Sequence, residues 1–155
     1  MKGNERLVGL LNVLLAQEHT AIAQYVIHAN MFDHWGYDAL YDYEMKRAHT
    51  EMRHAGMLVE RILVLDGTPV MSKLNNLAIG SDVAKILGSD RMAEIEANST
   101  YNSAIALAAE VGDGATRKML ESIVKDEDKH LAKIEEELNQ IAQMGLANYL
   151  STKNG

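Results

Sequence analysis

Proline is almost absent from this chain, and its scarcity constrains the fold more than any other feature of the sequence. Pro69 is the only proline in 155 residues, and an α-helix interior tolerates proline least of all residues. Apolar residues recur at helical spacing over four long stretches. Clusters of β-branched residues and Asn-Gly signals, which favour strands and hairpins, are few. The sequence therefore predicts an all-α fold built from long, uninterrupted helices.

Turn signals divide the chain into these helices. Trp35-Gly36 and Gly112-Asp113-Gly114 form short turns, whereas Asp66-Gly67-Thr68-Pro69 stops a helix. We predict helices over about residues 4–34, 38–65, 83–111 and 115–144, with Ser81 as N-cap of the third and a short fifth helix over about 146–151. Two short turns and one long crossover make an antiparallel four-helix bundle of two hairpins. We expect residues 1–155 to form one such domain.

A carboxylate interrupts the apolar stripe of each long helix near its middle, and two of the stripes add a histidine three residues later. These positions are Glu18, Glu51, His54, Glu94, Glu127 and His130. Residues three apart lie on the same helix face. Glu18 and Glu51 are separated by 33 positions, and so are Glu94 and Glu127. The two hairpins therefore present equivalent groups at equivalent heights, which predicts a pseudo-twofold site between them.

Charge predicts what this site binds. An unpaired carboxylate in a bundle core costs several kcal/mol, and four together would repel one another. Two divalent cations would balance four carboxylates, with neutral imidazoles completing the ligand set. Glu-x-x-His on two helices and Glu on the other two is typical of di-iron or di-manganese carboxylate sites. These ligand types suit iron, manganese or zinc, and the alternative is that the glutamates lie on solvated faces.

Four further residues are candidates for supporting the site. Asp90 and Asp126 would accept hydrogen bonds from the ligand histidines, although solvation at a helix end explains either almost as well. Tyr25 and Tyr101 each follow a ligand glutamate by seven positions. They would hydrogen-bond a ligand carboxylate or donate an electron, and the alternative is that they are ordinary core tyrosines.

The second helix carries another apolar stripe, which points away from the metal face. It comprises Met45, His49, Met52 and Val59, with Gly56 between them. A four-helix bundle needs one apolar stripe per helix, so a second stripe indicates contact with another chain. On the residues alone, packing in a dimer is the preferred interpretation of Met52.

Bulk composition excludes several other classes of protein. A net charge of −7 argues against nucleic-acid binding, and no stretch approaches the roughly 20 apolar residues that span a membrane. The chain has no cysteine, which leaves no disulfide or thiolate chemistry and suits the cytoplasm. Glu5 and Arg6 precede the first apolar stretch, so we interpret the N-terminus as the start of a helix and not a signal peptide.

The chain resembles the bacterioferritin family over nearly its whole length. The motifs that carry the resemblance are the opening MKG, Gln24-Tyr25, Trp35-Gly36, Glu51-Met52-Arg53-His54-Ala55, Arg61-Ile62-Leu63, Gly67-x-Pro69, Asp126-Glu127 with His130, and Met144-Gly145-Leu146-x-Asn148-Tyr149-Leu150. The resemblance implies a hollow shell of 24 identical subunits that oxidises Fe(II) with dioxygen or peroxide and stores a ferric mineral. It also implies two iron ions per subunit, with bridging by Glu51 and Glu127, which the residues alone do not distinguish from bridging by Glu18 and Glu127.

The same resemblance implies a b-type haem at twofold interfaces, with Met52 of each of two subunits as an axial ligand of the haem iron. A ferredoxin-like reductant would then release the stored iron. His19, Ala23 and Val26 depart from the family pattern and indicate a more open or more polar haem pocket. Lys46 and Thr50 stand where several members place an inner-surface iron site, which weakens the expectation of an internal iron relay and leaves the di-iron centre intact.

Two other functions compete with ferroxidase and storage. A di-iron oxygenase or peroxidase would use the same ligands on an organic substrate, but it would need a pocket beside the metals. The closely filled Leu, Ile and Ala stripes argue against such a pocket. A non-catalytic helical bundle, with solvated acidic residues, is the remaining alternative.

Overall fold

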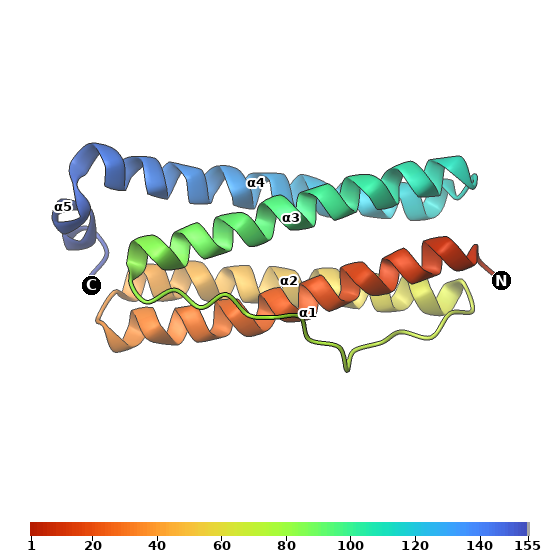
Figure 1. Ribbon diagram of the computed structural model, residues 1–155, viewed down its shortest axis with the longest axis horizontal. Helices are drawn as coiled ribbons and strands as arrows, with labels where there is room; N and C mark the ends of the chain where they lie inside the picture. The colour runs from red at the N-terminus through yellow and green to blue at the C-terminus, as the bar shows by residue number, and fades with distance from the viewer. Residues whose placement is uncertain (155) are drawn as a thin grey trace.

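Two helical hairpins lie side by side and form the body of the molecule (Figure 1). The computed structural model describes residues 1–154, which contain helices and connections but no strand. The helices are α1 (Glu5–His34), α2 (Asp38–Val64), α3 (Val83–Glu110), α4 (Gly114–Met144) and the short α5 (Leu146–Ser151). This confirms the predicted all-α four-helix bundle with a short C-terminal helix. Within residues 1–154, no helix is both long enough and apolar enough to cross a membrane.

Side-chain caps fix where three of the helices begin. Asn4 accepts a hydrogen bond from the backbone of Leu7 at the start of α1, and Asp113 caps α4 in the same way. Asp82 caps α3 through the N–H of Lys85, at 2.9 Å. The prediction of Ser81 as this cap was wrong, because Asp82 is the extended residue immediately before the helix and its carboxylate reaches the first free N–H groups.

The crossover from α2 to α3 runs along the outside of α1, from one end of the bundle to the other (Figure 1). Backbone N–H groups of the crossover donate hydrogen bonds to side chains on one face of α1. The pairs are Val70 to Asn12, Asn75 to Thr20, Ala78 to Gln24 and Gly80 to His28. A long connection would otherwise leave these backbone donors to solvent. The crossover is therefore a fixed wall beside α1.

Apolar side chains fill the bundle in two main clusters, with a layer of buried polar groups between them. One cluster packs Leu11, Leu14, Leu58, Ile62, Leu120 and Ile123. The other packs Phe32, Leu40, Ile86, Leu87, Ile134 and Tyr149. The polar layer consequently lies in surroundings of low dielectric, where charges interact strongly.

Helix α5 closes one end of the bundle (Figure 1). The Tyr149 hydroxyl donates a hydrogen bond to the buried carboxylate of Glu137, and Lys153 forms an ion pair with the same carboxylate at 2.9 Å. The backbone N–H of Ala39, in α2, donates to the carbonyl of Lys153. These contacts join the C-terminal segment to both hairpins.

Candidate metal centre

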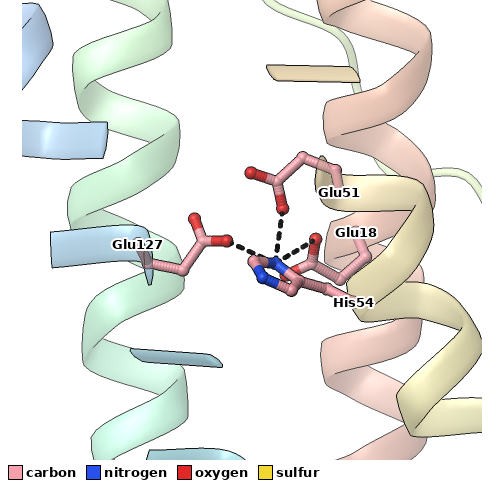
Figure 2. A group of neighbouring side chains, drawn as sticks. All are labelled: Glu18, Glu51, His54 and Glu127. Carbon is pink, nitrogen blue, oxygen red and sulfur yellow. Dashed lines mark hydrogen bonds and ion pairs between the residues drawn. The ribbon is translucent and has the colours of Figure 1, made fainter. Parts of the chain in front are cut away.

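All six side chains that the sequence singled out converge on one point in the middle of the bundle. Helix α1 contributes Glu18, α2 contributes Glu51 and His54, α3 contributes Glu94, and α4 contributes Glu127 and His130. Each glutamate is 1% exposed, and both histidines are buried. The interpretation of these glutamates as solvated is therefore wrong. Figure 2 shows Glu18, Glu51 and Glu127 around His54.

The six side chains form two overlapping groups, each of which could hold one ion. Glu18 and His54 belong to the first group only, Glu94 and His130 belong to the second only, and Glu51 and Glu127 belong to both. Each shared carboxylate presents one oxygen to each histidine. Glu51 lies 3.2 Å from His54 and 3.3 Å from His130, and Glu127 lies 2.8 Å and 3.9 Å from the same two rings.

Both histidines face the carboxylates with Nδ1. For His54 the opposite nitrogen, Nε2, lies 2.9 Å from Asp126 Oδ2. That carboxylate accepts a hydrogen bond from Nε2–H, and this favours the tautomer in which a metal ion can bind Nδ1, as metal-ligating histidines require. Arg53 also donates to Asp126, at 2.9 Å, and holds it in place.

Several polar atoms at the centre are buried without a hydrogen-bond partner. They are one carboxylate oxygen each of Glu18, Glu51, Glu94 and Glu127, together with Nδ1 of His130. Buried polar atoms in proteins are rarely left unpaired. Four carboxylate oxygens and one imidazole nitrogen, unpaired and directed at the same space, have the donor types that iron, manganese and zinc bind.

The electrostatics of the centre demand positive charge. Burial, together with the neighbouring carboxylates, raises the pKa of Glu18, Glu51 and Glu94 well above the usual range. Burial opposes ionisation of Glu127 as well, but its close polar neighbours, Glu94 first and then His54, outweigh it and lower the pKa of Glu127 to about 2. Burial and the Arg47 guanidinium lower the pKa of His130 to about 4. The centre thus offers a neutral His130 imidazole beside carboxylates that cannot all ionise without cations.

Two tyrosines link the hairpins through this centre. Tyr25 of α1 donates to Glu94 of α3 at 2.5 Å, and Tyr101 of α3 donates to Glu18 of α1 at 2.7 Å. Both rings are buried. The expected hydrogen bonds from tyrosine to ligand carboxylates are therefore present, and each crosses to the opposite hairpin.

Of the two predicted aspartate supports, only Asp126 contacts one of the six residues of the centre. Asp90 instead accepts hydrogen bonds from Gln24 and His28, both at 2.9 Å. Its position on α3, one turn before Glu94, faces α1 and the crossover, so the prediction for Asp90 was wrong. Sequence reasoning also missed His28 and Glu44, which are both buried. Their spacing carried a signal, because His28 follows Tyr25 by three positions and Glu44 precedes Glu51 by seven.

A cavity of about 670 Å³ lies beside the centre. Glu18, Glu51, Glu94 and Glu127 line its inner part, and its remaining walls come from α1, α3 and the crossover, including Gln17, Asn75, Asn76 and Thr100. The expectation that filled stripes leave no pocket beside the metals was wrong. Small side chains such as Ala21, Ala93 and Ala97 leave the space, and the crossover walls it.

The second stripe of α2 lies away from the centre. Met52 is 58% exposed, and a side chain added at Gly56, one turn further on, would meet no other atom within 4 Å. His49, on the same stripe, forms a hydrogen bond through Nδ1 with the backbone carbonyl of Met45 in its own helix. Around Met52 and Gly56 the stripe is thus an exposed face of the isolated subunit, whereas Val59 packs against the core.

A bundle of two hairpins around a buried carboxylate and histidine cluster defines a ferritin-like protein. In agreement, the family model "Ferritin: Ferritin-like domain" matches residues 8–144. The bacterioferritin of Mycolicibacterium paratuberculosis is 36% identical over 96% of this chain and 94% of that protein. The bacterioferritin of Streptomyces coelicolor is 36% identical over 98% of this chain and 91% of that protein. The bacterial ferritin of Pseudomonas aeruginosa is 34% identical over 99% of each of the two chains. The chain belongs to the bacterioferritin family.

Proposed function

We propose that this protein stores iron in the cytoplasm by oxidising Fe(II) at the buried centre and depositing Fe(III) inside an oligomeric shell. One observation carries the proposal: two groups of potential ligands overlap in Glu51 and Glu127. Such an overlap suits a pair of ions held close together, because each shared carboxylate has two oxygens and can serve both. The family assignment supports iron as the metal.

The ligand roles follow from the contacts. Glu18 and His54 would hold one iron ion, Glu94 and His130 would hold the other, and Glu51 and Glu127 would bridge them. The two bridging carboxylates present one oxygen to each side. Four carboxylates and two divalent cations are electrically neutral together, which removes the cost of burying the carboxylates alone.

The iron bound at the centre is itself the substrate of this reaction. Two Fe(II) ions give up two electrons, and dioxygen that takes up these electrons and two protons becomes hydrogen peroxide. Peroxide is the alternative acceptor. The chain's own contribution is to hold both ions beside one acceptor molecule. Tyr25 and Tyr101 orient the terminal carboxylates Glu94 and Glu18, and Asp126 keeps the Nδ1 atom of His54 free for metal.

The cavity beside the centre supplies a route for Fe(II). Its walls expose amide and hydroxyl groups, among them Asn75, Asn76 and Thr100, which a hydrated cation can contact. The Gln17 side chain donates to Thr100 at 3.0 Å and joins α1 to α3 beside this space. Fe(II) would therefore reach the centre from the crossover side of the subunit.

The assembly is proposed on the exposed stripe and on the family. The stripe around Met52 would pair with its copy in a twofold dimer, and 24 subunits would form the shell. A twofold axis presents the same residue twice, so Met52 of two subunits would ligate the iron of a b-type haem. The exposed Met52 and the open space at Gly56 suit a flat group. A bound haem supplies an electron path, and a ferredoxin-like reductant would use it to release iron.

A second candidate is a di-iron oxygenase or peroxidase without mineral storage, and the cavity is the observation that favours it. A space of about 670 Å³ is large enough for a small organic substrate. Its walls are largely apolar, but the four carboxylates at its inner end and the family assignment favour Fe(II) as the occupant.

Aerobic addition of Fe(II) to the purified protein separates the two candidates. We expect dioxygen consumption, a growing ferric absorbance and large particles with dense mineral cores in electron micrographs. A discrete monomer or dimer that consumes dioxygen without retaining ferric iron would contradict storage and favour the oxygenase.

A further inference from the structure

A second cluster of buried groups lies next to the centre, toward the end of the bundle that α5 closes. It comprises His28 of α1, Glu44 of α2 and Asp90 of α3, whose nearest ligand-type atoms lie within 4.8 Å of one another. All three are at most 1% exposed. Glu44 lies seven residues before Glu51, about 10 Å along the helix. None of the three belongs to the six side chains of the centre.

The hydrogen bonds of Asp90 leave one of its oxygens free. Gln24 Nε2 and His28 Nδ1 both contact Asp90 Oδ1, at 2.9 Å each. Asp90 Oδ2 is buried and has no partner. A carboxylate fixed by donors on one oxygen, with the other free, is the arrangement seen where carboxylates ligate metals.

His28 supports this cluster and does not ligate in it. The backbone N–H of Gly80 donates to His28 Nε2 at 3.1 Å. Nε2 is therefore unprotonated, and the proton of the neutral ring lies on Nδ1, from which it is donated to Asp90. His28 thereby positions Asp90 and also ties the cluster to the crossover.

Glu44 lacks any partner for its charge. Both of its carboxylate oxygens are buried without a hydrogen bond, and among residues 1–154 no lysine or arginine forms an ion pair with it. Burial, together with the facing Asp90, raises the pKa of Glu44. Arg47, one turn along α2, lowers that pKa, but its effect is smaller than those of burial and of Asp90. Three unpaired oxygens of two facing carboxylates thus share a space that calls for positive charge.

We propose that Glu44 and Asp90 form a separate site for a divalent cation that prefers oxygen ligands, such as Mn²⁺. Two carboxylates neutralise one such ion. The absence of a free imidazole nitrogen distinguishes this site from the neighbouring centre and favours hard cations over zinc. The inference uses different residues from the proposed di-iron centre and stands independently of iron storage.

Manganese is the probe for the test, because it is a hard cation that anomalous diffraction locates directly. Crystals of the full-length protein soaked with Mn(II) should show three anomalous peaks per subunit, one of them between Glu44 and Asp90. Glu44→Gln keeps the size of the side chain and should lose only that peak. Asp90→Asn is the second variant, and it should lose the same peak. Glu60→Gln, the same substitution at an exposed position of α2, should keep all three.

Equilibrium dialysis against Mn(II) measures the same change in solution. We expect uptake by Glu44→Gln to fall by one ion per subunit relative to wild type and Glu60→Gln. No peak between Glu44 and Asp90, or equal uptake by Glu44→Gln and wild type, would overturn the inference. If wild-type crystals show the peak between Glu44 and Asp90 but no peaks at the di-iron centre, the inference is supported and the proposed di-iron centre is contradicted.

Discussion

Tyr25 of α1 donates a hydrogen bond to Glu94 of α3, across the interface between the two hairpins. Tyr101 of α3 returns the same contact to Glu18 of α1. Each hairpin thus orients one terminal carboxylate of the other. Because the phenol binds the carboxylate and not the metal, it fixes the carboxylate position before any ion arrives.

Removal of either hydroxyl should weaken metal binding without unfolding the bundle. Tyr25→Phe and Tyr101→Phe keep the packed ring but free one oxygen of Glu94 or Glu18. Loss of a group that orients a metal ligand lowers affinity by about 10- to 100-fold. Anaerobic Fe(II) titration measures the change, with Tyr41→Phe, whose ring packs at the end of the bundle, as the matched control. Wild-type affinity in both variants would contradict the orienting role.

Asp126 should matter more than any acidic neighbour on the exposed face of α4. In Asp126→Asn the acceptor for the His54 Nε2 proton loses its charge, so the ring tautomer and basicity are less well fixed. We expect metal affinity to fall by about 10- to 100-fold. Asp128→Asn, two residues away on the exposed side, is the control. Equal affinities of the two variants would show that the contact between Asp126 and His54 does not serve the centre.

Haem binding should depend on Met52. Protein expressed with adequate haem should show a Soret band, and Met52→Leu should lose or shift it because leucine has no thioether sulfur. Met92→Leu changes another exposed methionine, on α3, and should leave the spectrum as in wild type. An undiminished and unshifted Soret band in Met52→Leu would rule out methionine ligation at this position.

Asp113 should contribute stability that acid removes. Burial raises the pKa of Asp113, but hydrogen bonds from Thr116 and the charge of Arg61 outweigh it and lower the pKa below the usual value. A carboxylate whose pKa falls on folding stabilises the protein above its unfolded pKa and loses that contribution as pH falls below about 4. Asp113→Ala also removes the N-cap of α4, which typically costs about 0.5–2 kcal/mol.

Urea unfolding at equal protein concentration checks this prediction. The midpoint of Asp113→Ala should lie below that of wild type at neutral pH, and the difference should shrink at acidic pH. Asp42→Ala, at an exposed position of α2, should show little difference at either pH. A difference for Asp113→Ala that persists unchanged in acid would contradict the electrostatic explanation.

The sequence was sufficient to predict the bundle and the convergence of the six side chains. Helical periodicity determines which face each helix buries, and the repeated spacing of Glu18, Glu51, Glu94 and Glu127 places them at one height. Those relationships lie within one helix or one hairpin, where the helical spacing of apolar residues and the short turn determine which side chains share a face and a height. Tyr25 and Tyr101 were found for the same reason.

The partners of Asp90 could not be predicted in the same way. Asp90 meets Gln24 and His28 of α1 only because α3 packs beside α1, and His28 is fixed by Gly80 of the crossover. The crossover has no repeating apolar pattern, so its alignment along α1 cannot be predicted from the sequence. The cavity was missed for a related reason, because its walls include crossover residues and the small side chains of α1 and α3.

Calorimetric titration of the metal-free protein with Fe(II), without oxygen, tests the central claim most directly. Glu51 presents one oxygen to each half of the centre, so Glu51→Ala should lower uptake by two ions per subunit. Glu60→Ala, on the exposed side of α2, should bind as wild type does. Unchanged uptake by Glu51→Ala, or a loss of a single ion, would contradict a di-iron centre bridged by Glu51.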